Sequence, residues 1–521
     1  MLRKIASFTI VLIFVFCGLT SAASDTIRVE GGLISGVLAD GVRSYKGIPF
    51  AAPPTGELRW KAPQPVVAWT GVRECNDFAP ECPQAPYPAG SMYASAPQKQ
   101  SEDCLYLNIW TAAKASEKRP VMVWIHGGAL TRGSGANRVY DGTALAKKGV
   151  VLVTLNYRLG PLGYLAHPEL TAESPHHSSG NYGVLDQIAA LKWVQKNIAA
   201  FGGDTSRVTI FGESAGSWSV NVLVASPLAK GLFHRAIGES GATFNRASFL
   251  KEDKAGMTSA EKVGVAFAKA AKADSIKALR ALPAEKIIEF FNNDSEGRKF
   301  RTQPNVDGWV LPDEIRNIFA ERKHNDVPTL IGSNANEMTT LTTPAMVPKT
   351  LEDFRKRVAT QYGEMVKEFD VAYPAKSDAD VAGAFLDSLR DTTFTLGMRT
   401  WARMTIKGRS KAYLYFFSRV PPNPNSKYLG AYHAAEIAYV FNNLNKANTA
   451  LQETDFKLAE QMSNYWVNFA TTGDPNGKGL TKWTAYNLEQ EPYMDFGNAI
   501  QSSNHLLKAQ LDFLEQFQQR R

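Results

Sequence analysis

The pentapeptide Gly212-Glu213-Ser214-Ala215-Gly216 constrains the fold of this 521-residue chain more than any other feature. It follows the β-branched and aromatic run Val208–Phe211, and a segment compatible with a helix follows it. A strand that turns directly into a helix brings the two backbones close together, which favours glycine on both sides of the turn. In such a turn the backbone of Ser214 is strained. The residue also lies at a helix N-terminus, where free N–H groups stabilise a developing negative charge. The pattern predicts that Ser214 is a nucleophile.

The rest of the chain alternates between strand-like and helix-like segments. Residues 184–200 have helical spacing, residues 250–300 and 350–410 look mostly helical, and the tail 450–520 reads as helix with loops. Strands are expected at Leu105–Trp110, Val121–Ile125, Gly149–Leu155, Val208–Phe211, Val327–Ile331 and Tyr413–Phe417. This alternation predicts an α/β fold with a large, mostly parallel, twisted central sheet flanked by helices, and with helical cap insertions at one end of the sheet. We expect one domain over residues 24–521.

The N-terminus has the pattern of a secretory signal peptide over residues 1–23. Arg3 and Lys4 precede an apolar run, and small residues follow at positions 21–23, so cleavage is expected after Ala22 or Ala23. An uncleaved anchor is the alternative, but the apolar run is short for one. We therefore expect an exported protein, secreted or periplasmic, without a stable membrane anchor. Loss of Arg3 and Lys4 lowers the net charge from +8 to +6, and the scattered basic residues give no support for nucleic-acid binding.

Three cysteines remain after cleavage, namely Cys75, Cys82 and Cys104. An odd number in an exported chain implies one disulfide and one free thiol. Chemistry alone leaves the pairing open.

A serine nucleophile needs a histidine base and a carboxylate that orients the base. In proteins with such a turn, the carboxylate residue comes after the serine in the sequence, and the histidine comes after the carboxylate. Of the eight histidines, His433 best fits the base, because it lies on a loop after a late strand-like run. A histidine on a surface loop is the alternative. Glu337, just after the strand expected at Val327–Ile331, is the natural acid. Asp307 is its rival but fits a turn better, and a solvated carboxylate is the default alternative for any single glutamate.

Backbone N–H groups for an oxyanion should come from a glycine turn after an early strand. The sequence His126-Gly127-Gly128-Ala129-Leu130 follows Val123–Ile125 and fits that place. We expect Gly128, Ala129 and Ala215 to supply these groups. The alternative is an ordinary turn between a strand and a loop.

These motifs together resemble the type-B carboxylesterase/lipase (cholinesterase-like) family of α/β-hydrolases, over essentially the whole mature chain. The resemblance rests on segments in a fixed order: Tyr45–Ala51, Pro53–Gly56 with Arg59-Trp60, Ser101–Asn108, His126–Ala129, Asn156–Gly160, Gly180–Gly183, Asp186-Gln187, Phe201–Asp204, Gly212–Gly216, Trp466–Ala470 and Thr472–Asn476.

The resemblance implies a role for each matching residue. The nucleophile, acid and base are Ser214, Glu337 and His433, and the oxyanion donors are Gly128, Ala129 and Ala215. Glu213 and Ser240 would lie beside them. The resemblance also implies a disulfide between Cys82 and Cys104 with Cys75 left as the thiol, and structural ion pairs Arg59–Glu102 and Arg158–Asp186.

Three positions depart from the family pattern. Ala129 stands where a third glycine is common, which narrows the site slightly. Met338 follows the acid where glycine is common. The segment between Cys82 and Cys104 contains Tyr87 and Tyr93 but no tryptophan to bind a quaternary ammonium, which argues against choline esters.

The resulting hypothesis is an exported serine carboxylesterase that acts on a small-molecule ester through an acyl-enzyme, with no metal and no organic cofactor. A non-catalytic adhesion or binding module and a lipase for longer acyl chains are the alternatives. The sequence leaves the oligomeric state open.

Four cations suggest a preference for anionic acyl groups. Arg132 lies two residues past the oxyanion turn, and Arg298, Lys299 and Arg301 flank Phe300 where relatives place acyl-pocket residues. The alternative is that these cations face water. The candidate substrate-binding residues are Arg132, Phe300, Leu130 and Trp218.

Overall fold

The computed structural model describes residues 26–88, 90–94, 98–244, 247–254, 256–300, 302–445, 448 and 450–520. The expected signal peptide lies outside these residues. The strands are β1 (Ile27–Val29), β2 (Gly32–Ser35), β3 (Val37–Ala39), β4 (Val42–Pro49), β5 (Val72–Glu74), β6 (Tyr106–Thr111), β7 (Arg119–Ile125), β8 (Val151–Leu155), β9 (Gly203–Glu213), β10 (Arg235–Glu239), β11 (Thr329–Asn334), β12 (Ala412–Phe417), β13 (Pro492–Phe496) and β14 (Ile500–Asn504).

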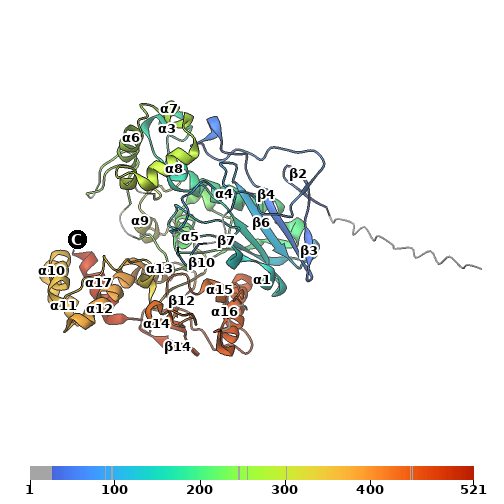
Figure 1. The fold of residues 1–521 in the computed structure, drawn as a ribbon. Coiled ribbons are helices and arrows are strands. Elements are labelled where there is room, and N and C mark those ends of the chain that lie inside the picture. Colours follow the sequence, from blue (N-terminus) through green and yellow to red (C-terminus); the bar gives the residue numbers. More distant parts are fainter. Residues whose placement is uncertain are drawn as a thin grey trace, which may run out of the picture.

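An 11-stranded sheet in the order β14-β13-β12-β11-β10-β9-β7-β8-β6-β4-β3 forms the centre of the molecule (Figure 1). All pairs from β8 to β13 are parallel. Both edges are antiparallel, with β6, β4 and β3 at one and β14 at the other. This confirms the predicted large, mostly parallel sheet. A second sheet has the order β1-β2-β5.

The central strands are apolar on both faces because both faces are covered. In β7, Val121, Val123 and Ile125 belong to one hydrophobic core, and Met122 and Trp124 belong to the other. Successive side chains of a strand point to opposite faces, so one short apolar run supports both layers.

Helices cover the two faces of the sheet and form two further groups, which Figure 1 shows at its left, above and below α9. The upper group contains α3, α6, α7 and α8, and the lower contains α10, α11, α12 and α17. The helices are α1 (Thr143–Lys147), α2 (Gly160–Tyr164), α3 (Pro168–Glu173), α4 (Tyr182–Asn197), α5 (Ala215–Ala225), α6 (Ala260–Ala270), α7 (Ile276–Ala281), α8 (Ala284–Asn293), α9 (Ile315–Ala320), α10 (Leu351–Tyr362), α11 (Val366–Ala372), α12 (Asp378–Arg390), α13 (Leu396–Thr405), α14 (Ser426–Leu429), α15 (Ile437–Val440), α16 (Glu453–Thr472) and α17 (Lys508–Gln519).

The tail differs from the sequence prediction, because it adds two strands to the sheet. Strand β13 pairs with β12, and β14 pairs with β13. The signal in β13 is a short alternation in which Met494 and Phe496 are buried and Tyr493 and Asp495 are half-buried. Strand β14 is polar and largely exposed at the edge of the sheet, so it lacks the apolar pattern of a strand.

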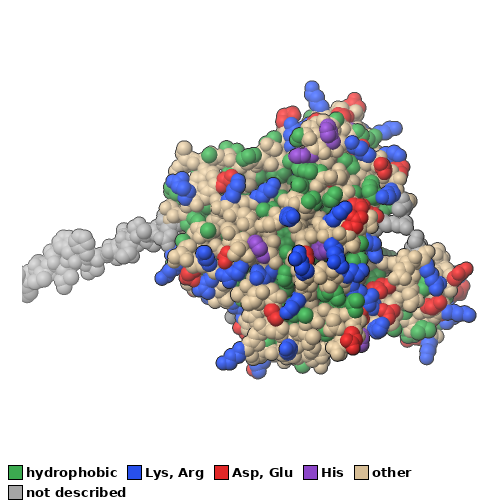
Figure 2. All heavy atoms as spheres, turned by 180° about the vertical axis from the view of Figure 1, so that it is seen from behind, with side chains coloured by type: hydrophobic (Ala, Val, Ile, Leu, Met, Phe, Trp, Pro, Cys, Tyr) green, Lys and Arg blue, Asp and Glu red, His purple; other side chains and the backbone are tan. Residues whose placement is uncertain are grey.

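Both ion pairs that the family resemblance implies are present. Arg59 Nη2 lies 2.5 Å from Glu102 Oε2, and Arg158 Nη2 lies 2.7 Å from Asp186 Oδ1. Basic and acidic side chains are interspersed over the face in Figure 2. Along the described residues, no helix has both the length and the apolar character needed to cross a membrane.

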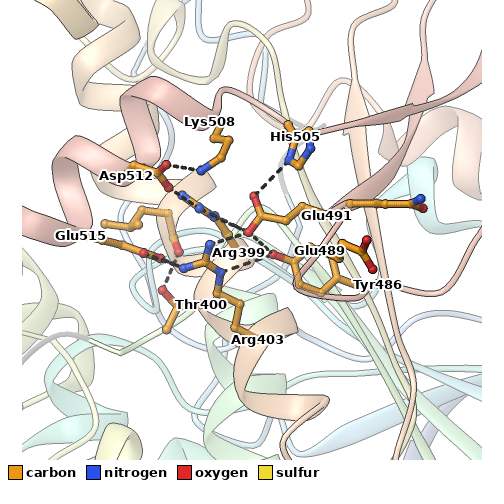
Figure 3. Close-up of polar contacts among 12 residues, drawn as sticks. Arg399, Thr400, Arg403, Tyr486, Glu489, Glu491, His505, Lys508, Asp512 and Glu515 are labelled. Atoms are coloured by element: carbon orange, nitrogen blue, oxygen red, sulfur yellow. Dashed lines mark hydrogen bonds and ion pairs between the residues drawn. The ribbon is translucent and has the colours of Figure 1, made fainter.

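A charged cluster, formed by Arg399, Arg403, Glu491, Asp512 and Glu515, fastens α17 to α13 (Figure 3). The Glu491 carboxylate accepts from Arg399 at 3.3 Å and also pairs with Arg403. On the α17 side, Asp512 pairs with Arg399, and Glu515 Oε2 lies 2.6 Å from Arg403 Nη1. Burial by itself would raise the pKa of Glu491, but the two arginines outweigh burial and lower the pKa of this carboxyl.

We expect Glu491→Gln to lower the free energy of unfolding by about 3 kcal/mol, because it leaves two arginines short of a buried partner. The lowered pKa of Glu491 means that its charge stabilises the fold fully above the unfolded pKa of about 4.3, and that this contribution is lost as the pH falls. Urea unfolding at neutral pH and at about pH 4 measures both effects, because the gap between wild type and variant should narrow in acid.

Glu321→Gln is the matched control, because Glu321 pairs with Lys323 on the surface and such pairs contribute little. Equal losses for the two variants would contradict the importance of the cluster.

Candidate active site

Ser214 lies between β9 and α5, on the predicted sharp turn. Its backbone angles are φ 56° and ψ −121°, a conformation that non-glycine residues rarely adopt. A Cβ atom added at Gly216 would lie 2.0 Å from the carbonyl oxygen of Ile125, and one added at Gly212 would lie 2.5 Å from it. Only glycine fits at both positions, and the close packing holds the serine at the helix N-terminus.

The structure brings Glu337 and His433 together at the carboxyl ends of the strands. Glu337 begins a short turn just after β11, and its Oε1 accepts a hydrogen bond of 2.7 Å from the backbone N–H of Asn334. Its Oε2 lies 2.6 Å from His433 Nδ1, so Nδ1–H donates to a carboxylate that the backbone holds in place. Both side chains are buried.

The other ring nitrogen of His433 faces Glu213. His433 Nε2 lies 3.1 Å from Glu213 Oε1. No hydrogen bond joins His433 to Ser214 Oγ in the part of the chain that the structure describes, although both residues line one cavity. Catalytic hydrogen bonds are commonly long or unformed without substrate.

Phe394 packs against His433 from a second direction. Its ring centroid lies 4.9 Å from that of the imidazole. Phe394 belongs to a π-helical turn (Asp391–Thr395) that joins α12 to α13. The position of His433 therefore depends on this helical segment as well as on Glu337.

Sequence reasoning missed two buried carboxylates close to Glu213, one of which, Glu436, also acts on the histidine. Glu436 Oε2 accepts from Asn334 Nδ2 at 2.5 Å, and Glu239 Oε1 accepts from Trp466 Nε1 at 2.8 Å. Both are fully buried. Their sequence signals are a glutamate three residues after the predicted base and a glutamate that ends an apolar strand.

The buried carboxylates and the histidine shift one another's pKa values. Burial raises the pKa of Glu436 to about 7, and nearby Glu337 adds to the rise. Burial also raises the pKa values of Glu213 and Glu239 well above the usual range for glutamate. For His433, burial alone would lower the pKa, but Glu213 and Glu337 outweigh it and raise the pKa to about 9.

Three backbone N–H groups remain free beside the serine. Within the described residues, the N–H groups of Gly128, Ala129 and Ala215 donate to no protein acceptor. Gly128 has φ 106°, and a Cβ there would lie 2.2 Å from the carbonyl oxygen of Arg132. These groups match the expected oxyanion donors. Ser240, expected beside them, directly follows β10 and is fully buried.

The cavity that contains Ser214 has a volume of about 880 Å³. Its walls come from three segments of the chain, together with Glu213, Ser214 and Leu341. The segments supply residues 81, 84–87, 92–94, 98 and 100, then residues 127–129, 132–134 and 137–140, and then residues 432–435, 437 and 438. A disulfide joins Cys82 to Cys104 and closes the first of these segments, and Cys75 is the free, buried thiol. Both outcomes agree with the family pattern.

The candidate substrate-binding residues divide into two groups. Arg132 lines the cavity, whereas Leu130, Trp218 and Phe300 are not among its lining residues. Leu130 is fully buried, and Phe300 packs into the core with its ring centroid 5.0 Å from that of Phe267. Phe300 was expected to bind substrate, but the structure instead places its side chain in the hydrophobic core.

The other predicted acidic and basic residues also have clear places. Arg298 and Lys299 are exposed away from the cavity, and Lys299 Nζ lies 2.6 Å from Glu296 Oε1. Arg301 lies outside the described residues. Asp307, the rival acid, caps a turn, because its Oδ1 accepts from the N–H groups of residues 309–311.

Comparisons with known proteins agree with this geometry. A family model described as "Carboxylesterase family" matches residues 23–514. The chain is 38% identical over 494 residues to fumonisin B1 esterase of Sphingopyxis macrogoltabida, covering 92% of this chain and 87% of that protein. It is 34% identical over 487 residues to para-nitrobenzyl esterase of Bacillus subtilis, covering 92% and 96%. A solved structure titled PNB esterase superposes with a TM-score of 0.79 at 32% identity, covering 94% of this chain and 99% of that one.

With the α/β-hydrolase fold and the buried Glu337–His433 pair beside Ser214, this chain belongs to the carboxylesterase family and is a carboxylic ester hydrolase.

Proposed function

We propose that the chain is an exported serine carboxylesterase in which Ser214 is the nucleophile, His433 the base and Glu337 the acid. The observation that carries the proposal is the 2.6 Å hydrogen bond from His433 to Glu337, in a cavity that also exposes Ser214. Export rests on the signal-peptide pattern of residues 1–23.

In the acylation step, neutral His433 takes the proton of Ser214 as the serine oxygen attacks the ester carbonyl. For this, Nε2 has to leave Glu213 and turn to the serine hydroxyl. The carbonyl oxygen becomes an oxyanion that accepts from the N–H groups of Gly128, Ala129 and Ala215, and each such donor contributes about 3 kcal/mol in measured oxyanion holes. His433 then protonates the leaving alcohol.

In the deacylation step, His433 takes a proton from water, and the hydroxide attacks the acyl-enzyme. The carboxylic acid product is released, and Ser214 regains its proton from His433. Glu337 stabilises the imidazolium in both steps and keeps Nδ1 protonated.

We also propose that the substrate is anionic, as the cations of the sequence suggest. The support for this preference is Arg132, which lines the cavity. Arg298 and Lys299 give it no support, because both are exposed and lie off the cavity.

Ser214→Ala should lower kcat/KM for a short neutral ester by about 10⁴-fold or more, because no other hydroxyl replaces the nucleophile. Steady-state hydrolysis of a butanoate ester measures the loss. Thermal unfolding should be unchanged within a few degrees, because the backbone forms the turn. The control is Ser206→Ala on β9, which should keep wild-type activity, and activity that survives Ser214→Ala would contradict the mechanism.

The pH profile of kcat/KM should show the influence of Glu213 on His433. Activity needs neutral His433, so kcat/KM rises with pH through the pKa of the histidine. Because the Glu213 carboxylate raises this pKa, Glu213→Gln should move the acid limb to lower pH by about one unit. Glu352→Gln, an exposed glutamate on α10, should not move the limb, and an unshifted limb in Glu213→Gln would show that Glu213 does not act on the base.

The preference for an anionic substrate predicts that an ester with a carboxylate, in its acid part or in its alcohol part, is hydrolysed faster than its neutral analogue. The ratio of kcat/KM values should reach about tenfold at low salt and fade at high salt and in Arg132→Ala. Lys299→Ala, off the cavity, should keep the ratio. Equal kcat/KM values for the two esters would leave no preference.

A further inference from the structure

The cavity beside Ser214 extends along the side of the catalytic histidine. His433 and its neighbours at positions 432, 434, 435, 437 and 438 form one wall. Tyr93 also lines the cavity and contacts the histidine, because its hydroxyl donates to the carbonyl oxygen of His433 at 3.0 Å. The ring centroid of Tyr87 lies 6.3 Å from that of Tyr93. The open space is therefore bounded by groups in contact with the base.

Large side chains on other approaches to the serine do not border this space. Phe394 covers His433 from behind and is buried, and Leu130 and Phe300 are buried in the core. Trp218, one turn after Ser214 on α5, is half-buried and is not among the lining residues. The room for a bulky substituent lies on the histidine side.

The chemistry of ester hydrolysis fixes which half of the substrate lies there. The group that leaves must take a proton from His433 Nε2, so its oxygen has to come within hydrogen-bond reach of that nitrogen. The carbonyl oxygen points instead at the oxyanion donors. Under the function proposed above, the part of the ester that follows the leaving oxygen enters the open cavity.

Arg132 lines that cavity, and its two terminal guanidinium nitrogens make no hydrogen bond to the described residues. Its Nε donates to the carbonyl oxygen of Ala85 at 3.2 Å, and its guanidinium carbon lies 5.6 Å from the centroid of the Tyr87 ring. Neither terminal nitrogen has a partner among the described residues. Two contacts thus fix a guanidinium with unpaired donors on a residue that lines a cavity large enough for a ligand.

The other charged groups of the cavity leave Arg132 without an ion pair. Glu81 Oε1 accepts from Gln100 Nε2 at 3.0 Å, and Glu213 faces His433. Arg138 is an exposed cation at the same cavity. An incoming carboxylate would meet a fixed donor pair at Arg132 and a second positive charge at Arg138.

We propose that Arg132 binds a carboxylate in the alcohol part of the ester, so that the preferred substrate carries its negative charge on the leaving group. This inference rests on the proposed function. It places the charge on the half of the substrate opposite to the one that the sequence suggests.

Three esters of matched size test the proposal. Butyl butanoate is neutral, 4-(butanoyloxy)butanoate carries a carboxylate in its alcohol part, and monobutyl succinate is an isomer with the carboxylate in its acid part. We would measure kcat/KM for each by product chromatography, at low and high salt, with wild type, Arg132→Ala and Arg132→Lys. Lys299→Ala serves as the control for a cation outside the cavity.

We expect 4-(butanoyloxy)butanoate to exceed butyl butanoate by about tenfold at low salt. Arg132→Ala should abolish this gain, and Arg132→Lys should restore part of it. Monobutyl succinate should show no gain that depends on Arg132.

Two outcomes would overturn the proposal: a gain for monobutyl succinate that depends on Arg132, or no gain that depends on Arg132 for either anionic ester. Both leave the proposed serine esterase mechanism intact as long as hydrolysis of butyl butanoate requires Ser214. Hydrolysis of all three esters by Ser214→Ala would instead contradict the proposed function itself.

Discussion

The contact between the serine turn and strand β7 is the constraint on which the rest of the site depends. Gly212 and Gly216 lie so close to the carbonyl oxygen of Ile125 that neither tolerates a Cβ atom. This packing holds Ser214 at φ 56° and fixes the N–H of Ala215, one of the proposed oxyanion donors, at the start of α5. The other two donors, at Gly128 and Ala129, directly follow β7. One close approach of β9 and α5 to β7 therefore positions both the proposed nucleophile and the proposed oxyanion donors.

Burial disfavours the negative charges of the carboxylates in this site, and His433 and Asn334 offset part of that cost. Glu213, Glu337 and Glu436 are buried near a single imidazole. Their charges raise the pKa of His433, while burial raises the pKa values of Glu213 and Glu436. A proton added to this group of residues belongs to the group and not to one side chain. The resting contact between His433 and Glu213 follows from this attraction, and substrate binding has to compete with it.

The sequence predicts those parts of the fold and site that depend on local patterns. The turn at Ser214, the buried strands and the Cys82–Cys104 disulfide each have a signature within a short segment or a family motif, and the structure contains all of them. Glu337 and His433, predicted from chain order and the preceding strands, lie together. Other features depend on partners far away in the chain. Glu239 accepts its hydrogen bond from Trp466, and Phe300 packs against Phe267 in the core. The polar segment β14 forms a strand by pairing with the free edge of β13.

The ion pairs that connect α17 to α13 affect when the site can be completed during synthesis of the chain. Helix α13 continues the π-helical turn that presses Phe394 against His433, and its Arg399 and Arg403 find carboxylate partners at residues 491, 512 and 515. A ribosome releases the N-terminal part of a chain first. Ser214 and Glu337 thus emerge long before the residues that anchor the support of His433. A nascent chain can form the turn at Ser214 early, yet the support of His433 is not anchored until residues 491, 512 and 515 have been made.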